Sequence, residues 1–231
     1  MRSWGWDMAR VVAVSGASGK TGYRIAEELL AAGVQPRLLL RRESAVPASL
    51  SNCEQVRLSI ENDCALDQAL LGAEALIIAT GARPSIDLSG PMRVDAWGVK
   101  RQIASCQRVN VNRVVLVSSL CAGRWRHPLN LFGLILVWKR IGERALERSG
   151  LNWTVVRPGG LSERESGLEQ EGIRLTGPDQ QDKNSIPRRL VAQCCVDALE
   201  TPGSIGRILE ITSDENVPRV ALAEALPSAA L

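Results

Sequence analysis

Three glycines spaced three residues apart are the most chemically informative feature of this sequence. Gly16, Gly19 and Gly22 lie between an apolar run at residues 10–15 and a segment with helical spacing at residues 23–32. Such a turn lets backbone N–H groups at the start of a helix approach a pyrophosphate, because no side chain obstructs them. The third glycine lets the helix pack closely on the strand. The spacing favours a dinucleotide-binding turn over a plain turn, with cofactor contacts from Gly16, Ser18, Gly19, Lys20, Thr21 and Gly22.

Two arginines follow the next predicted strand, about 20 residues after the last glycine, where the ribose of a dinucleotide would lie. An acidic residue at this place would bind the ribose 2′-OH and favour NAD. The chain has Arg41 and Arg42 instead, and a guanidinium group can bind a 2′-phosphate through two hydrogen bonds. We therefore predict NADP rather than NAD. The alternative is that both arginines are solvated and Glu43 contacts the ribose.

The elements that must position these residues predict a doubly wound α/β fold. The predicted strands are residues 10–15, 37–40, 55–58, 75–79, 114–118, 153–157 and 207–212, and the predicted helices are 23–32, 66–71, 91–109, 134–149 and 187–199. Strands that are apolar throughout indicate a parallel sheet covered by helices on both faces. We predict one Rossmann domain at residues 9–231, after an N-terminal extension at 1–8. The polar stretch 159–184 should be rich in loops and should belong to a small cap at about 159–205, over the ligand-binding edge of the sheet.

Composition narrows the possible functions. The chain has 231 residues, 45% of them hydrophobic and 23% charged, as is typical of a globular protein. A net charge of +3 with a single Tyr and a single Phe offers neither a basic patch nor an aromatic platform, so we expect no nucleic-acid partner. One histidine and six cysteines without ligand-like spacing predict no metal site. We interpret the cysteines as reduced, buried thiols.

Several motifs resemble the short-chain dehydrogenase/reductase superfamily, in its atypical, NmrA-like branch. The matching segments are residues 15–22, 79–82, 114–119, 137–140, 149–151 and 156–160. The last three are similar to the dehydrogenase-like domain of the plastid inner-envelope translocon's redox component and its cyanobacterial relatives. The resemblance covers residues 9–215 and implies a Rossmann fold and NADP(H) binding. It also implies cofactor contacts from Ala79, Thr80, Gly81, Lys139, Pro158 and Gly159.

The same family pattern places a tyrosine as proton donor, a lysine four residues later and a serine that orients the substrate carbonyl. If Lys139 is that lysine, Ile135 stands in the tyrosine position, and the single phenol, Tyr23, lies beside the glycine turn. The Ser-Tyr-Lys triad is therefore absent. Lys139 is predicted either to bind the nicotinamide ribose or to pair with Glu143 one helical turn later.

Other candidate residues lie after the strand at 114–118. Ser118 and Ser119 either contact the nicotinamide or a substrate oxygen, or simply end the strand. His127 is either a general acid or a surface histidine. Two further positions depart from the family pattern, because Ser59-Ile60 replaces a Gly-Asp whose Asp contacts adenine, and Arg101 stands where relatives often carry Asn.

The expected location follows from the absence of apolar segments. Residues 1–7 contain no apolar stretch typical of a secretory leader. The longest apolar run, residues 129–138, is about half as long as a transmembrane helix. We expect a cytoplasmic protein, or one of the plastid stroma if the source has plastids. The apolar stretch 131–138 is interpreted as half-buried helix, with a substrate pocket, peripheral membrane contact or a protein partner as alternatives.

Two functions of different classes remain open. One is an NADPH-dependent oxidoreductase without the triad, which transfers hydride to a planar conjugated acceptor such as a flavin, a quinone or a tetrapyrrole. Delocalisation of charge on such an acceptor removes the need for a protein proton donor. The other is a scaffold or assembly protein that senses NADP(H) and does little chemistry. The sequence leaves the acceptor and the protein partner unidentified.

Overall fold

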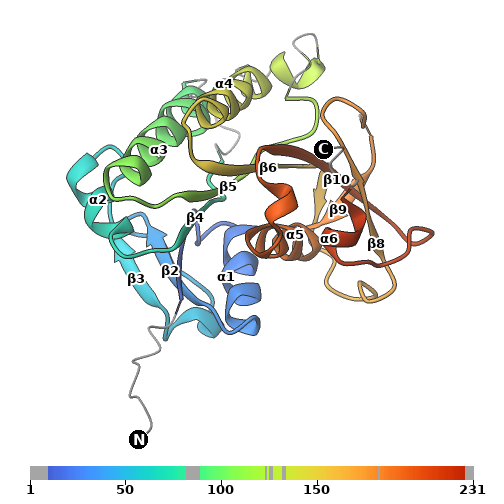
Figure 1. The fold of residues 1–231 in the computed structure, drawn as a ribbon, viewed down its shortest axis with the longest axis horizontal. Helices are drawn as coiled ribbons and strands as arrows, with labels where there is room; N and C mark the ends of the chain where they lie inside the picture. Colours follow the sequence, from blue (N-terminus) through green and yellow to red (C-terminus); the bar gives the residue numbers. More distant parts are fainter. Residues whose placement is uncertain are drawn as a thin grey trace, which may run out of the picture.

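The structure is a computed structural model that describes residues 10–81, 89–122, 124, 127–131, 134–181 and 183–226. Within these residues, one large sheet of eight strands forms the centre of the molecule, in the order β3-β2-β1-β4-β5-β6-β10-β8 (Figure 1). In that order the strands are Glu54–Arg57, Gln35–Leu40, Val11–Ser15, Ala75–Ile78, Arg113–Val117, Asn152–Pro158, Arg207–Asp214 and Gly172–Thr176. All neighbours are parallel except β8, which pairs with β10 in the antiparallel direction.

Helices cover both faces of this sheet. α1 (Gly22–Ala31) and α5 (Arg188–Glu200) pack on one face. α2 (Asp63–Leu70), α3 (Val99–Arg108) and α4 (Ile135–Glu147) pack on the other. Successive strand residues supply the two cores alternately, since Val12 and Val14 pack towards α1 whereas Ala13 packs towards α2 and α3. This two-sided burial explains why the central strands are apolar throughout, and the predicted α/β fold is confirmed.

Short elements complete the chain. A π-helix, η2 (Met92–Gly98), continues directly into α3, so the predicted helix 91–109 has a non-α first half. The 3-10 helices are η1 (Ala48–Leu50), η3 (Pro128–Leu131) and η4 (Pro202–Ser204), and α6 is Leu222–Ala225. In the described part of the chain, no helix is long and apolar enough to cross a membrane.

The segment after β6 contains strands that the sequence did not predict. β7 (Gly160–Ser162) pairs with β9 (Ser185–Pro187) in a small separate sheet, and β8 joins the main sheet. These strands are short and partly polar, so they lack the apolar runs that mark the central strands. α5, within the predicted cap, packs beside α1 under the main sheet (Figure 1). The division into a Rossmann domain and a cap at 159–205 stays a prediction.

A buried ion network joins β6, α4 and β10. Arg157 is 1% exposed and donates two hydrogen bonds to Glu143, at 2.9 and 2.8 Å, and one to Glu210 at 3.3 Å. Burial acts to lower the pKa of Arg157, but Glu143 and the other carboxylates raise it above its usual value. Glu210 also accepts hydrogen bonds from the backbone N–H groups of residues 179–181. The network therefore ties the loop after β8 to the core.

The thiols follow the predicted pattern in part. Cys106, Cys121, Cys194 and Cys195 are buried, Cys53 is half-buried and Cys64 is exposed, and among the described residues, which include all six, no disulfide forms. Burial raises the pKa of Cys106 and of Cys194 to about 12. Within the described residues, no group of three or more His, Cys, Asp or Glu side chains is placed to hold a metal ion.

Candidate functional site

The glycine turn between β1 and α1 is too tightly packed for side chains. Gly16 has φ +82°, and a Cβ there would lie 2.8 Å from the backbone carbonyl of Ala79. A Cβ on Gly22 would lie 2.1 Å from the carbonyl oxygen of Gly16. Thr21 occupies the N-cap position of α1 without a side-chain hydrogen bond. The turn therefore presents bare backbone at the start of a helix, which is the arrangement that binds a phosphate.

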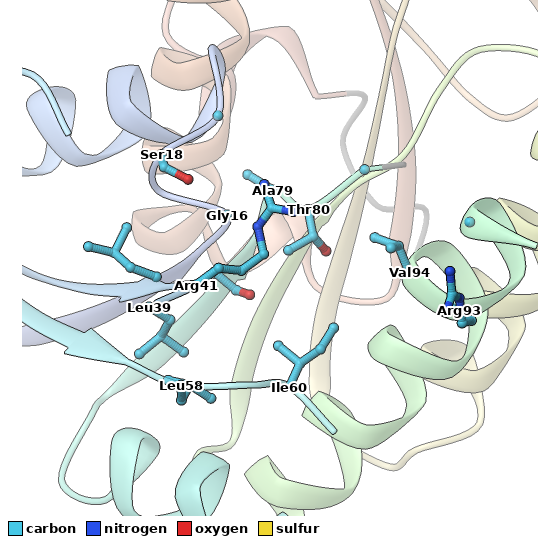
Figure 2. Close-up of a pocket in the computed structure, with 15 residues that line it drawn as sticks. Gly16, Ser18, Leu39, Arg41, Leu58, Ile60, Ala79, Thr80, Arg93 and Val94 are labelled. Atoms are coloured by element: carbon cyan, nitrogen blue, oxygen red, sulfur yellow. The ribbon is translucent and has the colours of Figure 1, made fainter. Parts of the chain in front are cut away.

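A cavity of about 360 Å³ opens beside this turn (Figure 2). It lies at the carboxyl ends of β1, β2, β3 and β4. The strand order reverses at β1, because β2 and β3 follow on one side of it and β4 and β5 on the other. This is the switch point at which open α/β sheets bind ligands. The predicted site residues that line the cavity are Gly16, Ser18, Gly19, Arg41, Ala79, Thr80 and Gly81. They come from three separate segments, which the fold brings together.

Part of the cavity lining is apolar. Leu39, Leu58, Ile60 and Val94 contribute to it, and Figure 2 shows Leu58 and Ile60 along the segment that follows β3, with Val94 on the opposite side beside Arg93. Ile60 in turn lies against the π-helix, because a Cβ on Gly98 would be 2.8 Å from its Cδ1. An apolar wall thus occupies the place where the family resemblance implies an adenine-binding carboxylate.

The two arginines predicted to bind a 2′-phosphate differ in position. Arg41 extends into the cavity (Figure 2), whereas Arg42 is exposed and does not line it. Arg57, which sequence analysis missed, donates hydrogen bonds to the carbonyl oxygens of Arg42 and Ser44, each at 2.8 Å. The available signal was weak, because Arg57 is simply a charged residue at a strand end.

Lys20, Thr21 and Gly22 do not line the cavity. The Lys20 ammonium forms an ion pair with Glu163, and Arg24 in the first turn of α1 pairs with Glu165. These contacts attach the segment after β7 to the start of α1. The side chain of Lys20 therefore faces this segment, and Gly22 serves the close packing of the turn.

Lys139 lies on α4 and points to the π-helix. Its Nζ is 2.8 Å from Oδ1 of Asp95, which is 3% exposed. The pair with Glu143 that helical spacing allows does not form, because Glu143 binds Arg157 and Arg140 instead. α4 approaches the π-helix so closely that a Cβ on Gly142 would be 2.3 Å from the carbonyl oxygen of Asp95. π-helical turns of this kind often occur at functional sites.

Two buried hydroxyl groups just after β4 and β5 have no hydrogen-bond partner among the described residues. They are Oγ1 of Thr80 and Oγ of Ser118. Thr80 lies two residues after Ile78, and Ser118 lies two residues after Leu116. Ile78 and Leu116 are paired across β4 and β5 and belong to the core beneath α2 and α3. Alternation along the strands therefore directs both hydroxyls to the face that carries α4 and η2. Buried unpaired hydroxyls are costly, so both are suited to contact a ligand.

The remaining predicted site residues, which follow β5 and β6, differ in their burial and contacts. Ser119 is half-buried and Pro158 ends β6. A Cβ on Gly159 would lie 2.5 Å from the carbonyl oxygen of Asn184, so the glycine is explained by packing alone. His127 is half-buried, begins the segment before η3 and does not line the cavity.

The position implied for a catalytic tyrosine is apolar. Ile135, at the start of α4, packs against Leu120, Cys121 and Leu136. Tyr23 lies on α1 and packs with the core on the opposite face of the sheet. No phenol of the described residues is therefore beside Lys139.

Comparison with known proteins identifies the family. The family described as NAD(P)H-binding matches residues 16–202. The chain belongs to this family. It is 33% identical to the Arabidopsis thaliana chloroplastic protein At2g34460, over 90% of the chain and 78% of that protein. It is 30% identical to sanguinarine reductase of Eschscholzia californica, over 82% of the chain and 84% of the reductase. It is also 29% identical to pea TIC 62, over 90% of the chain but 44% of TIC 62, in agreement with the translocon resemblance.

Solved structures show the same fold. A Bacillus halodurans protein, described provisionally as an NAD-dependent epimerase/dehydratase, superposes with a TM-score of 0.83 at 27% identity, over 94% of this chain and 100% of the other. A Veillonella parvula short-chain dehydrogenase/reductase in complex with NADP has a TM-score of 0.71 at 18% identity, over 89% and 95%. ChuY, an anaerobillin reductase from Escherichia coli O157:H7, has a TM-score of 0.72 at 18% identity, over 90% and 99%.

Proposed function

We propose that this member of the NAD(P)H-binding family is an NADP(H)-dependent reductase that transfers hydride to a planar conjugated acceptor. The observation that carries the proposal is the apolar packing of Ile135, which lies one helical turn before Lys139 at the position where the family pattern has a proton-donating phenol. A simple carbonyl develops alkoxide charge and needs a positioned donor. A flavin, a quinone or a tetrapyrrole delocalises the charge and takes its proton from water. Two similar proteins are named for the reduction of sanguinarine and of anaerobillin, which supports a conjugated acceptor.

The residues present fit the cofactor. The bare glycine turn suits the pyrophosphate, the apolar wall at Leu58 and Ile60 suits the adenine, and Arg41 suits a 2′-phosphate. NADPH, when bound, would supply the hydride. We assign Ser118 and Thr80 to hydrogen bonds with the carboxamide or the acceptor, because their buried hydroxyls have no partner among the residues that the structure describes. We assign Lys139 to the ribose hydroxyls, with Asp95 fixing its ammonium group.

The proposal is tested by two measurements on the purified protein. Titration with NADPH and with NADH should show tighter binding of NADPH. A screen with flavins, quinones and tetrapyrroles should then show cofactor oxidation, whereas simple aldehydes and ketones should be reduced only at a trace rate. Rapid, saturable reduction of a simple ketone would contradict the proposal, because that reaction needs the proton donor that Ile135 replaces.

The NADP preference has its own test in Arg41→Asp. The carboxylate would repel a 2′-phosphate and accept a hydrogen bond from a ribose hydroxyl, so NADPH should bind about 100-fold more weakly while NADH binds at least as well as before. Isothermal titration with both cofactors measures the difference. An equal loss for both would show that Arg41 does not read the 2′-phosphate, and would leave Glu43 as the residue beside the ribose.

A second function is favoured by exposed apolar side chains on the π-helix η2, which contacts Lys139, and on η3, which precedes α4. Trp97 on the π-helix and Leu131 in η3 are 58% and 84% exposed, and the chain is similar to TIC 62. In this alternative the protein senses NADP(H) and changes its affinity for a protein partner. Partner capture that is the same with NADP⁺ and with NADPH would eliminate it. The chloroplastic names of several relatives support a location in the plastid stroma if the source has plastids, and we propose a cytoplasmic location otherwise.

A further inference from the structure

Arg57 holds the turn that carries the cofactor-facing arginine. It is the last residue of β3 and pairs in register with Leu40, directly before Arg41. Its Nη1 contacts the carbonyl oxygens of Arg42 and Ser44 at 2.8 Å each and that of Arg41 at 3.4 Å. The turn is closed by a hydrogen bond from the Ser44 N–H to the Arg41 carbonyl, at 3.0 Å. One guanidinium group thus gathers three carbonyls of residues 41–44.

This arrangement has two electrostatic consequences. The three carbonyl oxygens are directed to Arg57, so their negative ends do not face the cavity that Arg41 enters. In addition, no carboxylate of the described residues forms an ion pair with Arg41, Arg42 or Arg57. Three guanidinium groups outnumber the single carboxylate of this turn, Glu43, so the net local potential is positive and attracts an anion.

We propose that Arg57 is a positioning residue for the 2′-phosphate of NADP(H). It does not line the cavity itself. It acts by fixing the backbone of residues 41–44, so that the Arg41 guanidinium is held towards the ligand and the turn offers no carbonyl to repel the phosphate. The inference rests on the proposed NADP preference and names a second residue on which that preference depends.

The geometry also predicts that lysine cannot replace Arg57. A guanidinium is planar and rigid, and it donates in several fixed directions, whereas an ammonium group is a compact charge on a flexible chain. A lysine would keep the positive potential but would not hold three carbonyls in one arrangement. The effects of Arg57→Met and Arg57→Lys therefore separate positioning from simple charge.

The test uses half-cofactors, so it does not depend on turnover. Isothermal titration measures binding of 2′,5′-ADP, which carries the 2′-phosphate, and of 5′-AMP, which lacks it. Arg57→Met and Arg57→Lys should each bind 2′,5′-ADP about tenfold more weakly, with 5′-AMP changed less than twofold. The matched control is Arg101→Met, because Arg101 likewise contacts a carbonyl, that of Glu61, and an aspartate beyond β3 but lies outside the cavity. This control should bind both nucleotides as the parent does.

Each other outcome overturns a defined part of the argument. Equal weakening of both nucleotides would show that Arg57 is merely structural, and full rescue by Arg57→Lys would show that its charge alone matters. If the parent binds 2′,5′-ADP no more tightly than 5′-AMP, the NADP preference itself is wrong. If Arg41→Asp abolishes the preference while both Arg57 variants keep it, only the inference about Arg57 fails. Thermal melting of every variant checks folding, and Arg57→Lys carries the test if Arg57→Met does not fold.

Discussion

The glycine turn and the Lys139 region lie at the same edge of the sheet but are held in place by different interactions. The turn depends on backbone clearances, since Cβ atoms at Gly16 or Gly22 would collide with main-chain atoms. The Lys139 region depends on charged side chains from distant segments, namely the pairs of Lys139 with Asp95 and of Arg157 with Glu143. The first half is suited by its shape to the nucleotide that we propose, and the second half is an assembly of buried charges.

This difference predicts which substitutions should affect ligand binding and which should affect folding stability. We expect a methyl group added at the cavity-lining Gly16 of the turn to reduce ligand binding more than it reduces the stability of the core. A buried ion network does the opposite, because removal of one partner leaves an uncompensated charge inside the protein. Substitutions in the two halves should therefore affect different observables.

The largest effect should come from Glu143→Ala. Arg157 would lose both hydrogen bonds of its bidentate partner while remaining buried. We expect a loss of about 3–5 kcal/mol in the free energy of unfolding, measured by urea denaturation. Glu147→Ala is the control, because Glu147 pairs with Arg140 nearer the surface and should cost less than about 1 kcal/mol. Similar losses for the two variants would contradict the distinction between the halves.

Gly16→Ala should have the next largest effect, and on binding rather than stability. The added Cβ would meet the backbone of Ala79 at 2.8 Å in a residue with φ +82°. NADPH affinity, followed by cofactor fluorescence, should fall by about 100-fold, or roughly 3 kcal/mol. Gly33→Ala has a similar φ of +75° but nothing within 4 Å of the new Cβ, so it should bind NADPH normally. Weak binding by both variants would mean that backbone strain alone causes the loss.

The same contrast explains how much could be predicted from the sequence. The central strands and the glycine turn are local features, in which apolar runs and residue spacing determine the structure directly. β1 and α1 accordingly begin and end within a residue of their predicted bounds. The short strands β7 and β9 were missed because only their mutual pairing makes them strands.

Long-range side-chain pairing was not predictable. Spacing along α4 suggested Glu143 as the partner of Lys139, but tertiary contact with Arg157 removes Glu143 and leaves Asp95 as the partner. Asp95 itself lies in a π-helix, whose extra residue per turn no periodicity analysis of a single sequence reveals. The role of Arg57 similarly depends on the register between β2 and β3. The backbone geometry of the glycine turn could therefore be largely predicted from the sequence, whereas the side-chain pairing near Lys139 could not.

A smaller effect is expected from loosening the Lys139–Asp95 pair. Asp95→Asn keeps the shape but removes the charge, and Lys139→Met removes the ammonium group. Because Lys139 is assigned to the ribose hydroxyls, each change should weaken NADPH binding about tenfold and lower turnover with a quinone, and the double variant should lose no more than the stronger single one. Steady-state kinetics together with NADPH titration measures this. Additive losses would show that the two residues act independently, and unchanged NADPH affinity would show that Lys139 does not bind the ribose.

The smallest effect, a gain, should come from Ile135→Tyr. The new phenol would lie one helical turn before Lys139, but beside Leu120 and Cys121, in an apolar cluster that has not been shaped to orient it. A well-placed general acid contributes about 10²–10⁴-fold, so this unoptimised one should raise reduction of a simple ketone by only about tenfold over the parent. The gain should decline at high pH as the phenol loses its proton, and Ile135→Phe should show none. Equal gains for Tyr and Phe would mean that shape, rather than proton donation, limits carbonyl reduction here.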